Sequence, residues 1–250
     1  MLPKSGLKLS VVVPAYQEEG CIESTVRTLH AELSKAEIPH EILVINDNSK
    51  DRTGEILDKL AMEISELKPL FNSGPNGFGM AVRFGLDRFN GDCVAIFMAD
   101  SSDSPTDLVR FYKKMVDQNV DCVFGNRWSQ ESTVVDYPFH KLILNRLANQ
   151  FISALFRIEY KDVTNAFKLY RKSVIEGIKP FLSPHYNLTV ELPLKAIIRG
   201  YSYAILPNDW RNRKAGYSKL KIKEMGSRYL FIVLYCLLEK WLSRGDYKKK

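Results

Sequence analysis

The first hundred residues alternate short β-branched runs with helical stripes, and this alternation restricts the chain to very few folds. Residues 9–13 form a β-branched run that ends at Pro14, and apolar residues then recur at helical spacing over 22–33. Residues 41–45, followed by a second stripe over 56–64, repeat the pattern. Two successive strand–helix units predict a Rossmann-like, mainly parallel sheet flanked by helices, which is an α/β fold.

The pattern continues beyond a glycine-rich turn at 74–79, which opens a third helix. The run 93–99 is apolar on both faces and predicts a central strand, and 120–125 predicts another. Between them, Ser104 is a suitable N-cap for a helix that has Pro105 at its first position. The first half therefore has the organisation of a nucleotide-binding sheet.

After about residue 140 the pattern changes, without a linker or an internal repeat. Helices are expected over roughly 140–157 and 186–199, with a strand near 202–206 and a basic loop at 210–219. We expect both halves to share one fold, in which the second half closes over the first. The predicted division is a catalytic domain at 1–221 and a basic amphipathic helix and tail at 222–250.

The apolar run 229–238 is the main feature of that tail. It is shorter than the 20 or so apolar residues that a membrane-spanning helix needs. Lysines and arginines flank it on both sides, which favours a helix lying at an anionic membrane surface. The alternative is a core helix or the seam of a homodimer.

Charge and cysteine usage restrict the partners and the compartment. Residues 1–125 carry a net charge of −6 and residues 126–250 a net charge of +13. The basic half needs an anionic partner: nucleic acid, an anionic membrane or a phosphorylated substrate. The four cysteines are scattered and the N-terminus has no signal-peptide core, so we expect a cytoplasmic protein, peripheral on the membrane, without structural zinc.

Polar residues follow each predicted strand at the point where the strand ends. Ligands of open α/β sheets bind beyond the carboxyl ends of the strands, so these residues form a candidate rim: Tyr16, Glu18, Asp47, Asp100 to Asp103, Asn126 and Arg127. Carboxylates at such a rim repel a diphosphate unless a cation intervenes, and Mg²⁺ or Mn²⁺ is suited by one or two carboxylates plus substrate phosphates. Asp100 is thus a candidate metal ligand. The glycine-rich turn matches neither phosphate-binding fingerprint, and close packing is its expected role.

Several motifs, in order, resemble family-two glycosyltransferases, and within them the dolichol-phosphate mannose synthases and related polyprenyl-phosphate glycosyltransferases. The resemblance covers about 8–220 and is carried by the segments 13–19, 44–51, 98–105, 124–128, 164–171 and 210–220. It implies an A-type glycosyltransferase fold. The last segment, similar to the family's Arg-x-x-Gly-x-Ser-Lys loop, is the most specific.

The resemblance also implies residue roles. Catalytic residues would be Asp100, Asp103, Arg127 and Arg213, and the metal, Mg²⁺ or Mn²⁺, would be held by Asp100, Ser102 and Asp103. The nucleotide-sugar would be bound by Pro14, Ala15, Tyr16, Glu18, Asp47, Ala99, Asp100, Arg127, Lys168, Arg213 and Lys219.

Three positions depart from the family pattern. Met98 stands where the first acid of the Asp-x-Asp motif belongs, Ser102 replaces a metal-binding Gln, and Asn46 replaces an acid. The expected metal site is therefore thinner than usual, with Asp103 as the helper of Asp100. The missing first acid also leaves open the interpretation that this chain is a non-catalytic relative of the family.

The expected reaction is an inverting transfer from a GDP- or UDP-sugar to a polyprenyl or dolichyl phosphate, whose anionic oxygen needs no general base. A soluble glycosyltransferase acting on a glycan hydroxyl is the alternative, and it needs a base, for which Asp103, Asp136 and Glu191 are candidates. A nucleotidyltransferase is less favoured. No nucleic-acid-binding module is recognisable.

Overall fold

The computed structural model describes residues 6–213 and 222–249. The strands are β1 (Leu9–Ala15), β2 (His40–Asn46), β3 (Leu67–Phe71), β4 (Cys93–Ile96), β5 (Cys122–Asn126), β6 (Val134–Val135), β7 (Lys168–Arg171), β8 (Tyr203–Pro207) and β9 (Trp210–Arg211). The helices are α1 (Ile22–Lys35), α2 (Thr53–Glu63), α3 (Phe78–Leu86), α4 (Pro105–Gln118), α5 (Phe139–Phe156), α6 (Lys172–Gly177), α7 (Leu188–Ile198) and α8 (Ile222–Leu242).

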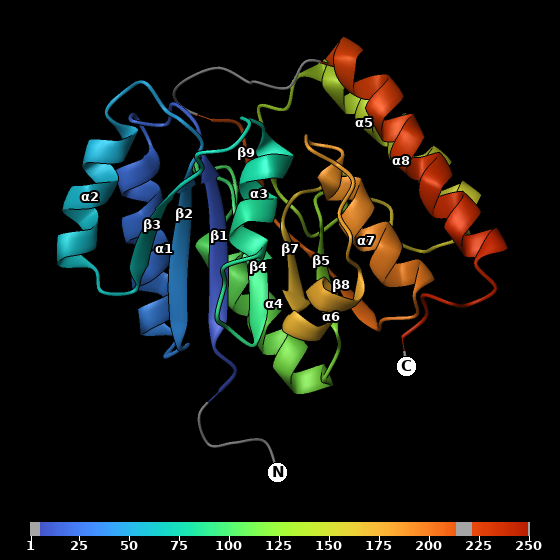
Figure 1. Ribbon diagram of the computed structural model, residues 1–250, viewed down its shortest axis with the longest axis horizontal. Coiled ribbons are helices and arrows are strands. Elements are labelled where there is room, and N and C mark those ends of the chain that lie inside the picture. The colour runs from blue at the N-terminus through green and yellow to red at the C-terminus, as the bar shows by residue number, and fades with distance from the viewer. Residues whose placement is uncertain (1–5, 214–221, 250) are drawn as a thin grey trace.

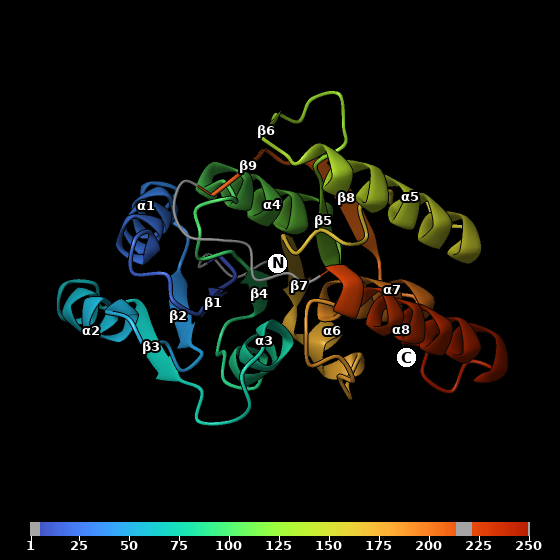
Figure 2. The same ribbon diagram turned by 90° about the horizontal axis from the view of Figure 1, so that it is seen from above.

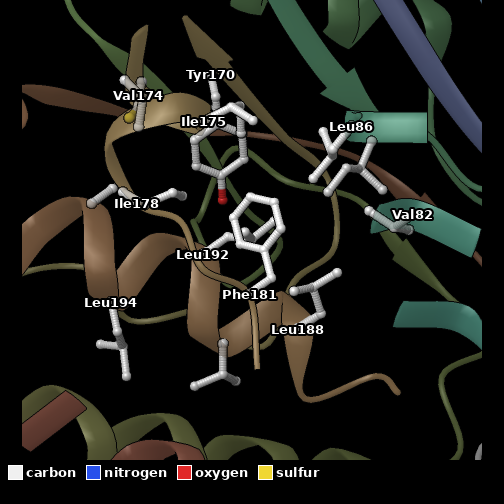
Figure 3. Close-up of a cluster of buried hydrophobic side chains, with 14 of the residues drawn as sticks. Val82, Leu86, Tyr170, Val174, Ile175, Ile178, Phe181, Leu188, Leu192 and Leu194 are labelled. Carbon is white, nitrogen blue, oxygen red and sulfur yellow. The ribbon is translucent and has the colours of Figure 1, made fainter. Parts of the chain in front are cut away.

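One sheet organises the molecule, as the strand–helix units predict. Within the described residues its strand order is β3-β2-β1-β4-β7-β5-β8, and β1 runs parallel to both β2 and β4. Helices α1, α2 and α4 pack on one buried cluster, and α3, α6 and α7 pack on another, across the sheet (Figures 1 and 2). Figure 3 shows the second cluster, in which Phe181 and Leu188 meet Val82 and Leu86 of α3. The predicted α/β class is confirmed.

Four strands were not expected: β6 and β9, which pair with each other in a small separate sheet, and β3 and β7 of the main sheet, each of which has a physical explanation. β7 lies antiparallel between β4 and β5, so the sheet is mixed. Its four residues, Lys168–Arg171, begin with a lysine and end with an arginine, so they contain no apolar run that predicts a strand. The lysine is nevertheless buried. β3 is an edge strand that contains Pro69, and proline is tolerated at an edge because fewer ladder hydrogen bonds are needed there.

The central strand β4 is shorter than the apolar run that predicts it. It ends at Ile96, although the run continues to Ala99. The N–H of Met98 donates to a carboxylate oxygen of Asp103 at 3.1 Å, so the backbone turns towards its own next loop. Phe97 still donates its N–H to the Val12 carbonyl oxygen of β1 at 3.0 Å, so the loop begins with Met98 and Ala99.

Helices α5 and α8 lie on the same side of the molecule, near the β8 end of the sheet (Figures 1 and 2). Ile232, Val233, Cys236 and Leu237 of α8 are buried in the core cluster that α7 also joins. Lys240 of α8 donates to the carbonyl oxygen of Phe156, at the end of α5, at 2.7 Å. No helix in 6–213 or 222–249 is long and apolar enough to cross a membrane. The division at residue 221 stays a prediction.

Candidate active site

The carboxyl ends of the strands form the rim that the sequence predicts, and two cavities open along it. The first, of about 440 Å³, lies over β1, β2 and β4, and the second, of about 500 Å³, extends between α5 and α8. Four residues line both cavities: Met98, Asp100, Tyr186 and Arg213. The two cavities therefore meet at the acidic turn that follows β4.

The first cavity gathers most of the predicted nucleotide-sugar residues. Its lining includes Pro14, Ala15, Tyr16, Glu18, Asp47, Ala99, Asp100 and Arg213. The loop after β1 is held there by α2 and the turn before it, because the Glu18 N–H donates to the Thr53 hydroxyl at 3.0 Å. Parallel β1, β2 and β4 end at one edge of the sheet, which explains why residues so distant in sequence meet.

Asp47 fixes the glycine-rich turn to the end of β2. One of its oxygens accepts from the Asn72 amide at 2.6 Å and the other from the Gly77 N–H at 2.8 Å. At Gly79 a Cβ would lie 2.6 Å from backbone atoms of the 184–185 segment, and only glycine permits that approach. Close packing as the role of the turn is thus confirmed.

The acidic turn is held by α1, which the sequence gives no reason to expect. Ser101 has a positive φ of 58°. The Thr25 hydroxyl lies 2.6 Å from the Ser101 hydroxyl and 2.9 Å from the Ala99 carbonyl oxygen, to which it donates. The Ser102 N–H donates to Asp100 at 3.1 Å. Thr25 therefore supports the conformation that presents the Asp100 carboxylate to both cavities.

Arg213 contacts the acidic turn from the second half of the chain. Its guanidinium lies 2.6 Å from an oxygen of Asp100 and 3.8 Å from an oxygen of Glu18. All three side chains are largely buried, with 16% of Arg213 exposed. The predicted catalytic pair Asp100 and Arg213 is thus in direct contact.

Asp103 lines the second cavity and is almost fully buried. Burial, and next the Asp100 carboxylate, raise the pKa of Asp103 to about 7. The side chain of Ser102 lines the same cavity. The three predicted metal residues therefore lie along one turn.

Arg127 also lines the second cavity, but its charge has a protein partner. Its guanidinium donates to both oxygens of Asp162, at 2.8 and 2.9 Å. Burial opposes the charge of Arg127, and the Asp162 carboxylate outweighs burial and raises the pKa of Arg127 above its usual range. Sequence reasoning missed Asp162, because a lone acid before the motif at 164–171 carries no local signal.

Lys168 is not brought to either cavity, contrary to the predicted role in nucleotide-sugar binding. Its ammonium is buried and donates to the backbone carbonyl oxygens of Val163, Asn165 and Thr189. Burial lowers the pKa of Lys168 to about 7. Its position indicates a structural role, holding the loop before β7 against α7. Lys219, also predicted at the site, lies outside the described residues.

Two of the three candidate general bases lie away from the cavities. Both oxygens of Glu191 accept backbone N–H groups, from Leu182 and Ser183, and Lys195 lies 2.6 Å from one of them. Asp136 is exposed in the loop after β6, outside the lining of either cavity. Asp103 is the candidate that lines one.

The far wall of the second cavity is apolar. Leu144, Ala148, Phe151 and Ile152 of α5 face it from one side, and Gly226, Tyr229, Leu230 and Val233 of α8 from the other. On the side of the strands, its lining includes Asp100, Asp103, Arg127 and Arg213. The cavity is therefore polar and charged at one end and apolar at the other. Arg228, also of α8, lines the first cavity.

The donor set at the acidic turn fits a divalent cation that shares its ligands with a substrate. Magnesium and manganese sites of this kind use one or two carboxylates together with phosphate oxygens. Asp100 and Asp103 are such carboxylates, and both line the second cavity. The described residues contain no group of three His, Cys, Asp or Glu that would hold a metal without a substrate.

Comparison with known sequences identifies the family. The profile described as "Glycosyl transferase family 2" matches residues 10–179. The chain is 29% identical over 216 residues to a polyprenol monophosphomannose synthase of Mycolicibacterium smegmatis, which covers 84% of this chain and 80% of that protein. It is 27% identical over 210 residues to the glycosyltransferase AglD of Haloferax volcanii, with 82% of this chain and 33% of that protein covered.

Solved structures share the fold. Glucosyl-3-phosphoglycerate synthase from Mycobacterium tuberculosis, crystallised with UDP, superposes with a TM-score of 0.69 over 95% of this chain and 81% of that one, at 18% identity. The same enzyme with Mn²⁺, UDP and phosphoglyceric acid superposes with a TM-score of 0.67, over 95% and 79%, at 19% identity. The A-type glycosyltransferase fold is confirmed.

Proposed function

Since the chain belongs to glycosyl transferase family 2, and is a glycosyltransferase, we propose that it moves a sugar from a GDP- or UDP-sugar to a polyprenyl or dolichyl phosphate at a membrane surface. The observation that carries this proposal is the second cavity, which joins an apolar groove between α5 and α8 to the charged acidic turn. The similarity to a polyprenol monophosphomannose synthase supports the same acceptor. The family assignment argues against the alternative that the protein is a nucleotidyltransferase.

The two ends of the second cavity match the two ends of a polyprenyl phosphate. Such a lipid has an anionic head and a long hydrocarbon tail, and burying hydrocarbon against apolar side chains is favourable by about 25 cal/mol per Å². Leu144 and Phe151 on α5, and Leu230 on α8, offer that apolar contact. Lys141 and Arg213 line the same cavity and offer positive charge to the phosphate. A glycan acceptor would gain little from the apolar wall.

The outer surface of the same two helices supports a membrane partner. Large apolar side chains that are exposed and do not line the cavity include Phe139, Ile143 and Leu147 of α5, and Phe231, Leu234, Leu238, Trp241 and Leu242 of α8. On α5 they recur at every fourth residue, which puts them on one face of the helix. Exposed apolar surface of this extent marks an interaction site, and basic residues beside it, such as Arg146 and Arg244, favour an anionic bilayer.

The residues of the site divide the reaction between them. The first cavity holds the nucleoside diphosphate with Asp47 and Glu18 near its base and ribose, and Arg213 stabilises the negative charge that develops on the leaving diphosphate. A divalent cation at Asp100, when bound, supplies further positive charge to that leaving group. The acceptor phosphate oxygen attacks from the second cavity, on the opposite side of the sugar, so the configuration inverts. It is already anionic and needs no base.

One observation favours a second candidate. Asp103 lines the acceptor cavity, and its pKa of about 7 suits a general base for a sugar hydroxyl. A hydroxyl acceptor would then replace the lipid phosphate, and the apolar groove would bind another apolar group.

The deciding experiment offers the protein GDP- and UDP-sugars with polyprenyl phosphate or with a soluble glycan, and identifies the product by mass spectrometry. We expect a glycosylated polyprenyl phosphate that requires Mn²⁺ or Mg²⁺ and is lost with Asp100→Ala. Asp103→Asn, assayed at saturating Mn²⁺ because Asp103 is also a candidate metal ligand, should abolish transfer to a hydroxyl, which needs a base, and should leave transfer to the anionic lipid phosphate, which does not. A product formed only on the glycan would overturn the lipid acceptor.

A further inference from the structure

We propose that Arg213 is an internal counter-cation, which occupies the acidic turn before substrate binds and competes there with the divalent cation. On this proposal, the ion pair between Arg213 and Asp100 also separates the two cavities until the donor arrives. The proposal rests on the proposed function only for the identity of the donor, a nucleoside diphosphate with a divalent cation.

Arg213 lies where the two cavities meet. Its guanidinium is 2.6 Å from the Asp100 oxygen and 3.8 Å from a Glu18 oxygen, so it bridges two carboxylates at the meeting point of the cavities. The exposed fractions of Asp100 and Glu18 are 7% and 10%. Burying two carboxylates without a cation between them is costly, and Arg213 supplies that positive charge.

A divalent cation would compete with Arg213 for the Asp100 carboxylate. At 2.6 Å the guanidinium nitrogen is in hydrogen-bond contact with the Asp100 oxygen, and a cation bound to that oxygen would need the same space. The first acid of the family motif is Met98 here, so the turn has fewer carboxylates to share between two cations. A divalent cation on its own must displace Arg213, and bound phosphates make that displacement favourable because they offer Arg213 new acceptors.

The ion pair between Arg213 and Asp100 also lies between the two cavities. Asp100 and Arg213 both line both cavities, and the pair between them stands on the boundary. When Arg213 moves from Asp100 to the diphosphate, it stays beside the leaving group, where its charge assists transfer.

The test measures Mn²⁺ affinity by electron paramagnetic resonance of the free ion, without any nucleotide or acceptor, at Mn²⁺ concentrations high enough to fill the weak site that two carboxylates make without substrate phosphates. Arg213→Gln should bind Mn²⁺ about tenfold more tightly than the unaltered protein, because its competitor is gone. Arg211→Gln is the matched control. Arg211 lies two residues before Arg213 and its side chain is exposed, so this variant removes the same charge from the same loop. The contact of Arg211 with the acidic turn is made by its backbone N–H, which donates to the Ser102 carbonyl oxygen, and the variant should therefore leave the affinity unchanged.

Two further variants keep the outcome decisive. Asp100→Asn added to Arg213→Gln should remove the gain, since the Asp100 carboxylate released from Arg213 produces it. If Arg213→Gln fails to fold, Arg213→Lys takes its place and should still bind Mn²⁺ more tightly than the unaltered protein, because a single ammonium pairs less well than a guanidinium. Unchanged or weaker Mn²⁺ binding in both Arg213 variants would overturn the proposal. Because no transfer is measured, this result is independent of which acceptor the enzyme uses.

Discussion

Asp162 and Arg127 form a bidentate ion pair in which the carboxylate of Asp162 is entirely buried and the Arg127 side chain is 9% exposed. The same two oxygens also accept the backbone N–H of Arg127, at 2.9 Å, and the indole N–H of Trp128, at 3.1 Å. One acid thus fixes the wall of the acceptor cavity by four hydrogen bonds.

Replacing Asp162 by Ala should lower the free energy of unfolding by about 3–5 kcal/mol, because Arg127 then remains as a buried, unpaired charge. Urea denaturation followed by circular dichroism measures this loss. The double variant Arg127→Met with Asp162→Leu should recover much of the stability but not the transfer activity. If the single and double variants were equally unstable, the pair would not be the source of the effect.

The stability of the protein should depend on pH through Asp103. Its pKa of about 7 lies above the ordinary carboxyl value of 3.8, so between these values the folded protein holds a proton that the unfolded chain has lost. The free energy of unfolding should therefore fall as the pH rises from 4 to about 7, with the full contribution present below that interval. Asp103→Asn stays uncharged, and its denaturation midpoint should lack this part of the slope. An identical pH slope in both proteins would contradict the raised pKa.

Lys168→Met should weaken the fold and leave donor binding intact. Three carbonyl oxygens lose their donor, so thermal unfolding should occur at a lower temperature. The dissociation constant for a nucleotide-sugar, measured by calorimetry below that temperature, should stay within about twofold of the unaltered protein, a difference of only some 0.4 kcal/mol. A large loss of affinity would instead indicate that Lys168 takes part in binding the nucleotide-sugar.

Gly226 offers a way to block the acceptor groove without touching the donor cavity. It lines the groove from α8, and a Cβ there would meet open space. Gly226→Phe should fill the groove and lower transfer to polyprenyl phosphate about tenfold or more, which corresponds to about 1.4 kcal/mol or more of lost transition-state binding. Gly226→Ala is the matched control and should remain active. Equal activity of the two variants would indicate that the lipid takes another path.

The exposed apolar side chains of α5 and α8 should determine membrane binding. We expect the protein to float with vesicles rich in anionic lipid, most strongly at low salt, and the pair Leu147→Ser with Leu234→Ser, neither of which lines the cavity, to bind less. Met62 on α2 is more exposed, at 85%, and lies on another element, so Met62→Ser should bind like the unaltered protein. A gel-filtration dimer that loses its partner in the Leu147 and Leu234 variant, with no vesicle binding, would instead assign the surface to a homodimer.

The sequence by itself determined the strand–helix succession and the residues at its strand ends. Runs such as 9–13 and 41–45 are apolar because they lie inside a parallel sheet, and Asp47 and Asp100 follow them because polar groups must begin where strands leave the core. Local periodicity contains this information, and in the structure Pro14, Glu18 and Asp100 line one cavity.

Only the tertiary structure decided which charges face the substrate and which face each other. Arg127 and Lys168 are both basic residues within family-like motifs, yet one pairs with Asp162 and the other with backbone carbonyls. Burial makes an unpaired charge costly, so the nearest partner in space determines the role, and for Arg127 that partner is 35 residues away in the chain. The pairing of Arg213 with Asp100 across half of the sequence has the same origin.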